Sequence, residues 1–307
     1  SSSGVIHKVL AGIENALWDI KGKMLNSPVY SLFGGEINKE IPLYWSHCGT
    51  SRVRASEIIK KPAIRKIDDL YRFSEDILAS GYKHIKTNIG VLVDDPYVYM
   101  PGYARSQGGP ELNLDRKILN HIVSWISNFR SAVGPDIDIS LDLNFNFKID
   151  GYKTVCKSIE DYNLSWVEID SYDPISLKDI KNGIPQTLAS CENLYGLREY
   201  RPFIENRSMD IVIIDIIWNG ISKSRSIAEL VNSYEMSVCT HNYNGHLSTA
   251  ISTHFCAITP NLKICEIDVD DVPWIDDLFT YPPKIKNGCV VLSDRPGWGT
   301  EPIENII

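Results

Sequence analysis

The chain has 307 residues, with 31 Lys and Arg against 39 Asp and Glu, and a formal net charge of −8 at pH 7. This acidic balance argues against a nucleic-acid partner, and an anionic ligand must therefore meet a local cation, either a metal or a specific Lys or Arg. A hydrophobic share of 43% suits a folded protein with a large core. No apolar run reaches the ~18 residues of a membrane span, so no membrane partner is expected.

The cysteines indicate a reducing environment. Seven cysteines lie scattered through apolar segments, and none of them forms a CxxC pair. An odd number in this pattern predicts reduced thiols in the core, rather than a disulfide framework or a structural zinc site. We therefore expect a cytoplasmic protein.

The predicted elements open with a long amphipathic helix over residues 5–25, followed by a strand over 41–45. A helix over 68–79 and a strand over 83–89 come next. The stretch 90–113 is rich in Pro, Gly and Tyr, which predicts an irregular excursion. Loops of this length in compact enzymes are usually functional lids or binding loops.

From Asp115 onward, helical and strand patterns alternate regularly. Helices are predicted over 115–132, 151–161, 176–182, 195–206, 221–234 and 246–257. Strands are predicted over 137–141, 164–168, 185–191, 210–215, 236–240 and 262–266. Short apolar runs that alternate with helices predict a parallel sheet. With the two earlier strands, eight strands would close a TIM-type (β/α) barrel, an α/β fold of roughly 250 residues.

Six acidic or imidazole residues close consecutive apolar runs at intervals of 23 to 26 residues. They are Asp142, Glu168, Glu192, Asp215, His241 and Glu266. One strand, its helix and the two connecting loops of a barrel use about that much chain. Each residue is therefore expected at the carboxyl end of a strand, on the rim where the catalytic groups of such barrels collect.

Asp142, Glu168 and Glu192 end three consecutive predicted strands. Three neighbouring carboxylates cannot all stay ionised in a partly buried rim unless a cation lies between them. Oxygen-only ligands suit Mg²⁺ or Mn²⁺. A carboxylate after a strand can instead cap the following helix. Three in a row at matched positions favour the metal site.

Lys86 and His241 are the candidate acid–base groups. By strict alternation, Lys86 shares a strand face with His84 and Asn88. A Lys facing a barrel interior near a divalent cation could serve as a base, or it could pair with one of the carboxylates. His241 and Asp215 close adjacent strands, and a carboxylate on one imidazole nitrogen raises the basicity of the other.

Further polar residues surround the same rim. Glu266 could hydrogen-bond a substrate oxygen, or it could cap the segment that follows. Arg105 lies in the long excursion and could clamp a substrate carboxylate, although a solvated loop Arg or an interface patch fits the same pattern. The candidate substrate-binding residues are His47, Asn88, Arg105, Asn144 and Asn242.

Together these residues resemble the enolase superfamily, in its mandelate racemase and sugar-acid dehydratase branch. The segment 11–23 with Leu32-Phe33-Gly34-Gly35 is similar to the end of the family's amino-terminal capping domain. The segment 81–88 resembles its second-strand Lys-x-Lys motif. Three strings, Asp142-Leu143-Asn144, Trp166-Val167-Glu168 and Cys191-Glu192-Asn193, fall where its magnesium ligands lie. Asp215, His241 and Glu266 fall where its Asp–His dyad and late-strand Glu lie.

The resemblance implies a modified (β/α)7β barrel over residues 41–270. Residues 1–40 would be the remnant of a capping domain that is otherwise mostly missing, and 271–307 a tail that returns to the cap side. It also implies a homo-oligomer that binds Mg²⁺, with Mn²⁺ as an alternative, through Asp142, Glu168 and Glu192.

The activity implied by the resemblance is α-proton abstraction from a carboxylate, with Lys86 and His241 on opposite faces of the substrate. Elimination of a hydroxyl would make the protein a sugar-acid dehydratase that forms a 2-keto-3-deoxy acid. A racemase or epimerase of a 2-hydroxy acid is the second hypothesis, and a catalytically silent fragment is the third. Two residues depart from the family pattern: Asn88 replaces the second Lys, and Asp215 stands one residue nearer to the following glycine.

Overall fold

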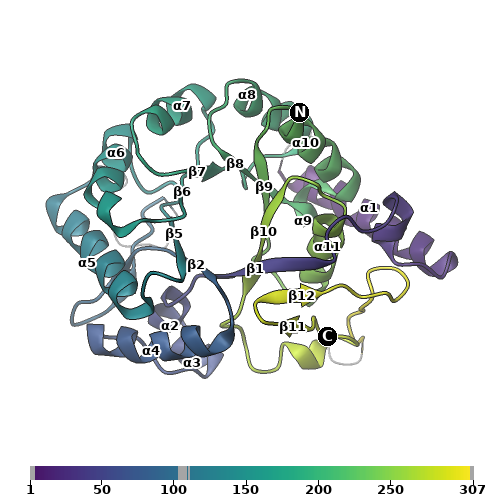
Figure 1. Cartoon of the computed structure of the whole chain (residues 1–307), viewed down its shortest axis with the longest axis horizontal. Coiled ribbons are helices and arrows are strands. Elements are labelled where there is room, and N and C mark those ends of the chain that lie inside the picture. Colours follow the sequence, from purple (N-terminus) through teal and green to yellow (C-terminus); the bar gives the residue numbers. More distant parts are fainter. Residues whose placement is uncertain (1–3, 103–108, 110, 305–307) are drawn as a thin grey trace.

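The computed structural model describes residues 4–102, 109 and 111–304. Eight parallel strands close a barrel inside an outer ring of helices, as Figure 1 shows. The first strand pairs with both the second and the last strand of the barrel, which completes the closure. The TIM-type α/β barrel predicted from the sequence is confirmed. Its strands are β1 (Glu40–Ser46), β2 (His84–Thr87), β5 (Asp138–Asp142), β6 (Trp166–Glu168), β7 (Leu188–Ser190), β8 (Ile211–Asp215), β9 (Ser237–His241) and β10 (Leu262–Asp268).

The longer helices follow the predicted order. They are α1 (Val5–Met24), α4 (Ile67–Ser80), α5 (Arg116–Val133), α6 (Ile149–Ser158), α7 (Pro174–Asn182), α8 (Gly196–Glu205), α10 (Ile221–Ser233) and α11 (His246–Ala257). The sequence patterns missed several short elements. These are α2 (Thr50–Arg54), α3 (Ser56–Ile59), α9 (Ile216–Asn219), and the 3₁₀ turns Val29–Phe33, Glu160–Tyr162 and Asp276–Leu278.

Two short hairpins lie outside the barrel. Within the excursion after β2, β3 (Gly90–Val91) pairs with β4 (Tyr97–Val98). In the tail, β11 (Ile285–Lys286) pairs with β12 (Cys289–Val291), and β12 pairs antiparallel with the start of β1. The tail is thereby attached to the amino-terminal end of the barrel.

A compact apolar layer fills the interior of the barrel below its carboxyl-terminal rim. Its members are Tyr44, Trp166, Ala189, Ile211, Ile213, Cys239 and Ile264. Side chains two residues apart point to the same face of a strand. The next inward position above this layer is therefore a polar residue in several strands. Such pairs are Tyr44 and Ser46, Trp166 and Glu168, Ile213 and Asp215, Cys239 and His241, and Ile264 and Glu266.

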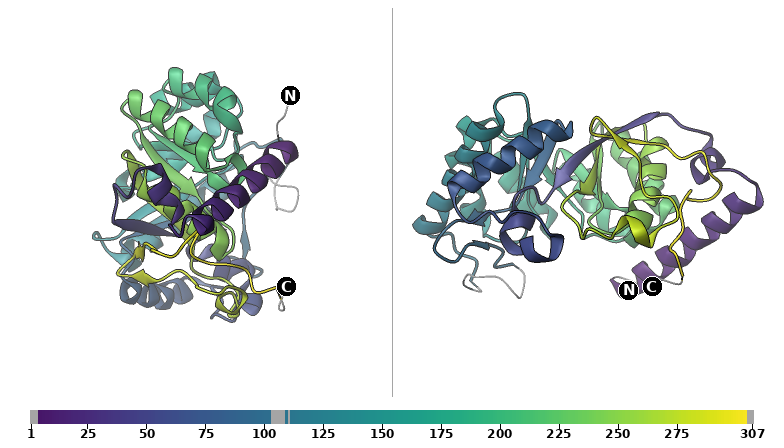
Figure 2. Two further views of the ribbon diagram at one scale, coloured as in Figure 1. Left: turned by 90° about the vertical axis from the view of Figure 1, so that its right-hand side faces the viewer. Right: turned by 90° about the horizontal axis from the view of Figure 1, so that it is seen from below.

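Helix α1 lies along the outside of the barrel, beside the tail, as Figure 2 shows. Its buried Asn15 accepts a hydrogen bond from the backbone of Ile221, and the indole of Trp298 donates to the Asn15 carbonyl. A Cβ on Gly22 would lie 2.8 Å from the Cα of Gly297, so this close approach requires glycine. The opposite face of the helix exposes apolar side chains, which are Val5, Ile6, Val9, Leu10, Ile13, Leu17, Ile20 and Met24.

The cysteines agree with the prediction of reduced thiols. All seven are free, and six of them are buried. Within the described part of the chain, every helix is too short or too polar to cross a bilayer.

Candidate active site at the barrel mouth

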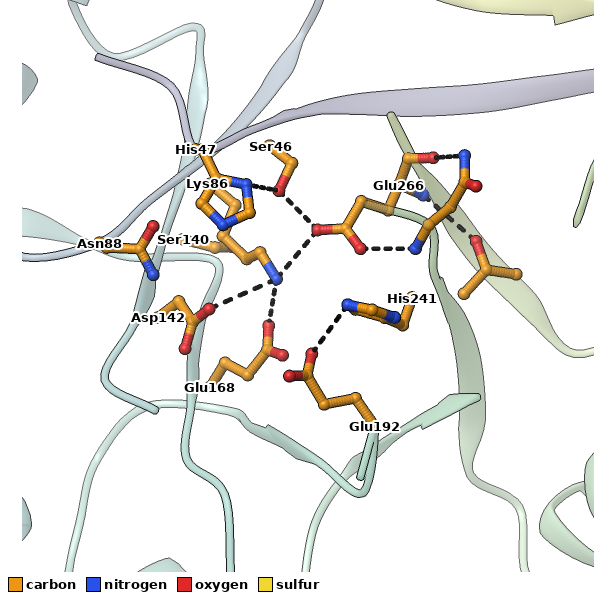
Figure 3. Close-up of polar contacts among 12 residues, drawn as sticks. Ser46, His47, Lys86, Asn88, Ser140, Asp142, Glu168, Glu192, His241 and Glu266 are labelled. Carbon is orange, nitrogen blue, oxygen red and sulfur yellow. Dashed lines mark hydrogen bonds and ion pairs between the residues drawn. The ribbon is translucent and has the colours of Figure 1, made fainter. Parts of the chain in front are cut away.

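The carboxyl ends of the strands bring the predicted catalytic and metal-binding side chains into one cluster, and Figure 3 shows all of them except Asp215. In the register of the sheet, Asp142 is paired with Glu168, and Asp215 is paired with His241. Glu192 follows Cys191, which has a φ of 92°, an unusual backbone conformation for a residue with a side chain. Such strain is typical of functional sites, and here it immediately precedes a predicted metal ligand.

The ammonium group of Lys86 lies among three carboxylates. Its Nζ is 2.7 Å from Glu168 Oε2, 3.2 Å from Glu266 Oε1 and 3.7 Å from Asp142 Oδ2. Burial alone would lower the pKa of Lys86, but the charges of Glu168 and Glu266 outweigh burial and hold this pKa well above its ordinary value. The pairing that the sequence left open is present in the structure.

The three predicted metal ligands lie in an acidic, desolvated environment. Burial raises the pKa values of Asp142 and Glu168, and burial together with the Asp170 charge raises the pKa of Glu192 to about 7. The Oε1 atom of Glu168 is buried and has no hydrogen-bond partner among the described residues. A buried carboxylate oxygen without a partner, between two further carboxylates, suits an oxygen-binding divalent cation.

As the side chains lie, no group of three or more His, Cys, Asp or Glu in the described ranges is placed to hold a metal ion. The cation among the carboxylates is the ammonium of Lys86. The oxygen ligands of Asp142, Glu168 and Glu192 therefore have the chemistry of a magnesium site. In this structure, however, Asp142 and Glu168 are oriented towards the ammonium of Lys86.

His241 and Asp215 form a hydrogen-bonded pair. The Nδ1 of His241 lies 2.7 Å from Asp215 Oδ2, and the other carboxylate oxygen of Asp215 accepts a hydrogen bond of 2.7 Å from the backbone of Trp218. Burial would lower the pKa of His241, but the charge of Glu192 and the bond to Asp215 raise it to about 10. Asp215 therefore fixes the imidazole orientation, and Nε2 is directed towards Glu192 at 3.9 Å.

Glu266 is held from two sides. Its Oε1 accepts a hydrogen bond of 2.5 Å from Ser46, and its Oε2 accepts one of 2.7 Å from the backbone of Asn242. Burial would raise its pKa, but Lys86 and His241 lower it. The Asn242 amide donates to Thr249 and to the Glu266 carbonyl, and accepts from Ser248. Asn242 is therefore placed to position Glu266, with its side chain already hydrogen-bonded to protein groups.

The other predicted substrate-binding residues occupy the same rim. The His47 ring lies 3.1 Å from Ser46 Oγ through Nδ1, and it packs 4.1 Å from the Tyr243 ring. The Asn88 amide donates to Asn144 Oδ1 at 3.3 Å. Arg105 lies outside the described residues.

Two residues at this mouth were missed by the sequence interpretation. Ser46 bonds both Glu266 and His47, and it ends the first strand at the inward position that follows Tyr44. Asp170 lies two residues beyond Glu168, and its charge acts on Glu192. In both cases the period-two alternation used for Lys86 is a signal that could have identified the residue.

Comparison with known families gives two matches along the chain. Residues 69–306 match the family described as enolase C-terminal domain-like. The chain belongs to this family. Residues 5–34 match the amino-terminal domain of mandelate racemase and muconate lactonizing enzymes. The resemblance inferred from the site residues is confirmed.

Curated relatives are similar over nearly the whole chain. The D-xylonate dehydratase of Haloferax volcanii is 26% identical over 306 residues, which cover 97% of this chain and 68% of the relative. The D-gluconate dehydratase of Thermoproteus tenax is 23% identical over 311 residues, covering 97% of this chain and 55% of the relative.

A closely similar solved structure comes from Burkholderia xenovorans strain LB400. It is provisionally assigned as an L-alanine-DL-glutamate epimerase, with magnesium and fumarate bound. It is 41% identical with a TM-score of 0.97, and the match covers all of this chain and 76% of that one. An enolase superfamily member from Salmonella Typhimurium is 26% identical with a TM-score of 0.88, covering 99% of this chain and 76% of that one.

Proposed function

We propose that this protein is a metal-dependent dehydratase of a sugar acid of the aldonate or aldarate type. The observation that carries the proposal is the Asp215–His241 pair, which directs an imidazole nitrogen towards a cluster of buried carboxylates. Relatives named as dehydratases of D-xylonate and D-gluconate support the same reaction class.

Asp142, Glu168 and Glu192 would hold the metal, with Mg²⁺ as the first candidate and Mn²⁺ as the second. The unpartnered Oε1 of Glu168 and the raised pKa values of these acids support this donor set. A divalent cation bound there supplies positive charge at the substrate carboxylate, which makes the neighbouring C–H acidic enough to lose its proton.

His241 and Lys86 are the groups of this chain that would move protons. In Figure 3 the ammonium of Lys86 lies among Asp142, Glu168 and Glu266, and the His241 ring lies beside Glu192. One takes the proton from C2, and the hydroxyl on C3 leaves as water after it receives a proton from the other. The resulting enol tautomerises to a 2-keto-3-deoxy acid. Asp215 keeps the His241 ring oriented throughout, through its 2.7 Å bond to Nδ1.

The remaining rim residues would bind the substrate. Glu266 would hydrogen-bond a substrate oxygen, and Ser46 and Asn242 hold its carboxylate in place. His47, Asn88, Asn144 and Arg105 remain the proposed binding groups for the hydroxyls or the carboxylate.

Epimerisation or racemisation is the second candidate function. It is favoured by the 41% identical structure with the provisional epimerase assignment, and by the presence of two candidate proton-transferring groups, Lys86 and His241, at the same cluster of carboxylates. If both groups exchange protons with the same carbon, the configuration inverts and the hydroxyl stays.

Incubation with Mg²⁺ and a panel of sugar acids in D₂O distinguishes these reactions. The proposal predicts a 2-keto-3-deoxy acid from at least one member of the panel. Deuterium incorporation with the hydroxyl retained would establish the epimerase instead. Absence of both, with Mg²⁺ binding intact, would overturn the enzymatic proposal and support a catalytically silent protein.

Three broader properties are proposed with the function. We propose a division into a cap segment over 1–40, a catalytic barrel over 41–270 and a returning tail over 271–307. The apolar exposed face of α1 favours a homo-oligomer. The seven free cysteines favour a cytoplasmic location.

A further inference from the structure

A cavity of about 530 Å³ lies beside the metal-binding side of the cluster. It is formed where the loop between β5 and α6 meets the loop between β6 and α7. Helices α6 and α7 are neighbours in the ring of Figure 1. One wall is aromatic, and one carboxyl group lies on the side that faces the cluster. The lining residues used below are Phe145, Phe147, Tyr152, Asp170 and Tyr172.

The aromatic side chains give the cavity flat apolar surfaces. The rings of Phe145 and Tyr172 stack with centroids 5.1 Å apart and an interplanar angle of 22°. Tyr172 is 70% exposed at the opening. The ring of Tyr152 packs edge-on against Phe147. Its hydroxyl donates a 2.7 Å hydrogen bond to the backbone of Asn144, so this wall is attached directly to the rim of the active site.

In this cavity, Asp170 has a buried carboxylate oxygen without a hydrogen-bond partner in the described part of the chain. The residue is 4% exposed, and its Oδ2 has no hydrogen-bond partner among the described residues. Buried polar atoms are nearly always paired, and leaving one unpaired costs about 1–3 kcal/mol. Its backbone N–H donates to the Asn144 carbonyl at 3.3 Å, which keeps the residue at the end of the strand that carries Glu168.

We infer that this cavity is the subsite for the distal hydroxyls of the substrate, with Asp170 as a substrate-binding residue. This inference rests on the proposed function. A sugar acid whose carboxylate met a metal held by Asp142, Glu168 and Glu192 would lie close to Asp170, because Asp170 stands two residues beyond Glu168 on the same strand face. The carboxyl group of Asp170 can accept hydrogen bonds from hydroxyls, and the exposed ring of Tyr172 can pack against the C–H groups of the chain. The ligand class is therefore a polyhydroxylated acid rather than an acid with an unsubstituted alkyl chain.

The test measures selectivity for distal hydroxyls in the chain carrying His241→Asn, which suppresses turnover. Isothermal titration calorimetry with Mg²⁺ present compares D-xylonate, D-gluconate, D-galactonate and D-mannonate with 2-hydroxypentanoate and 2-hydroxyhexanoate. Asp170→Ala and Asp170→Asn are added to this background. Asp150→Asn is the matched control, because Asp150 lines the same cavity but is exposed.

We expect at least one sugar acid to bind more tightly than its deoxygenated counterpart. Asp170→Ala should reduce that preference roughly 10- to 100-fold, because it removes the acceptor for the hydroxyls. The dissociation constants of Mg²⁺ and of the 2-hydroxy acids should stay within twofold, and Asp150→Asn should change none of these values.

Two results would overturn the subsite. One is a lack of preference for any sugar acid, or a preference that survives Asp170→Ala. The other is a weakened affinity for Mg²⁺ itself, which would assign Asp170 to the metal instead. Turnover of a sugar acid by the wild-type chain with selectivity unchanged in Asp170→Ala keeps the proposed function and removes the subsite. If Asp170→Ala loses the selectivity but the wild-type chain turns over none of the sugar acids, the subsite is kept and the proposed function is removed.

Discussion

The barrel mouth and the contact between α1 and the barrel use buried polar groups in opposite ways. At the mouth, the ammonium of Lys86 is buried against several carboxylates, and Glu168 keeps an unpaired oxygen. At the α1 contact, the neutral amide of Asn15 accepts a hydrogen bond from the backbone of Ile221. Nearby, Nδ1 of the His254 imidazole accepts one from the backbone of Tyr30, and its Nε2 has no partner among the described residues. A concentration of buried charge is costly for folding, so the position of these charged groups at the barrel mouth indicates the active site. Substitutions at the mouth should therefore change activity most, and substitutions at the α1 contact should change stability alone.

The largest effect is expected for Glu192→Gln. The amide keeps the shape of the side chain but is a weaker ligand for a hard cation, so metal-dependent turnover should fall by at least about 10³-fold. Calorimetry should show weaker Mg²⁺ binding in the same variant. Glu205→Gln, on an exposed ion pair with Arg201, is the control. Near wild-type activity of Glu192→Gln would exclude the proposed metal site.

His241→Asn should come next, with a loss of about 10³-fold in kcat, because it removes a general acid–base group. Its affinity for Mg²⁺ should stay within a factor of two, which separates this effect from that of Glu192→Gln. His246→Asn is the matched control, since His246 pairs with Asp276 outside the cluster. Retention of more than a tenth of the wild-type kcat would remove His241 from the chemistry.

Lys86→Met should lower kcat by about 10²-fold and should also destabilise the metal-free protein. Removing the cation leaves Glu168 and Glu266 buried without their partner, which typically costs about 3–5 kcal/mol. Added Mg²⁺ should recover part of the lost melting temperature in this variant. If turnover is unchanged while the melting temperature falls, Lys86 has an electrostatic role only.

The smallest effect concerns His254, which contacts Tyr30 and Trp298, and it changes stability rather than turnover. Burial lowers the pKa of His254 to about 3. Below pH 6.5, the ordinary pKa of histidine, His254 therefore binds a proton in the unfolded chain but not in the folded chain. The stabilisation that comes from keeping His254 neutral is complete above pH 6.5. It is lost as the pH falls, and the free energy of unfolding is lower by roughly 2 kcal/mol at pH 5.

Denaturant unfolding at pH 8 and pH 5 checks this contribution. His254→Gln should shrink the difference in unfolding free energy between the two pH values by about that amount. The same pH dependence in both proteins would show that His254 does not titrate on unfolding.

The strand order and the rim residues could be predicted because they depend on local hydrophobic patterns and on the regular length of a βα unit. Helix α9 was missed because Ile216, Ile217 and Trp218 continue the apolar run of β8. The end of the strand is shown by the bond from the Trp218 backbone to Asp215 and by the bond from the Gly220 backbone to the Ile216 carbonyl. The pairing of β12 with β1 joins segments about 250 residues apart, and no local pattern encodes it.

The candidate site shows the same limit. Alternation placed Lys86 on the inward face, but its contact with Glu266 depends on closure of the barrel between β1 and β10. Asn242 was predicted to bind substrate as a hydrogen-bond donor near the rim. The structure shows its amide bonded to Thr249 and Ser248, contacts that depend on how α11 packs against the rim.

Crystals soaked with Mn²⁺ and a sugar acid test the central claim most directly. We expect one anomalous peak in contact with Asp142, Glu168 and Glu192, with the acid bound between Lys86 and His241. A structure in which Lys86 still occupies the space among the carboxylates, and the metal is absent or bound elsewhere, would contradict it.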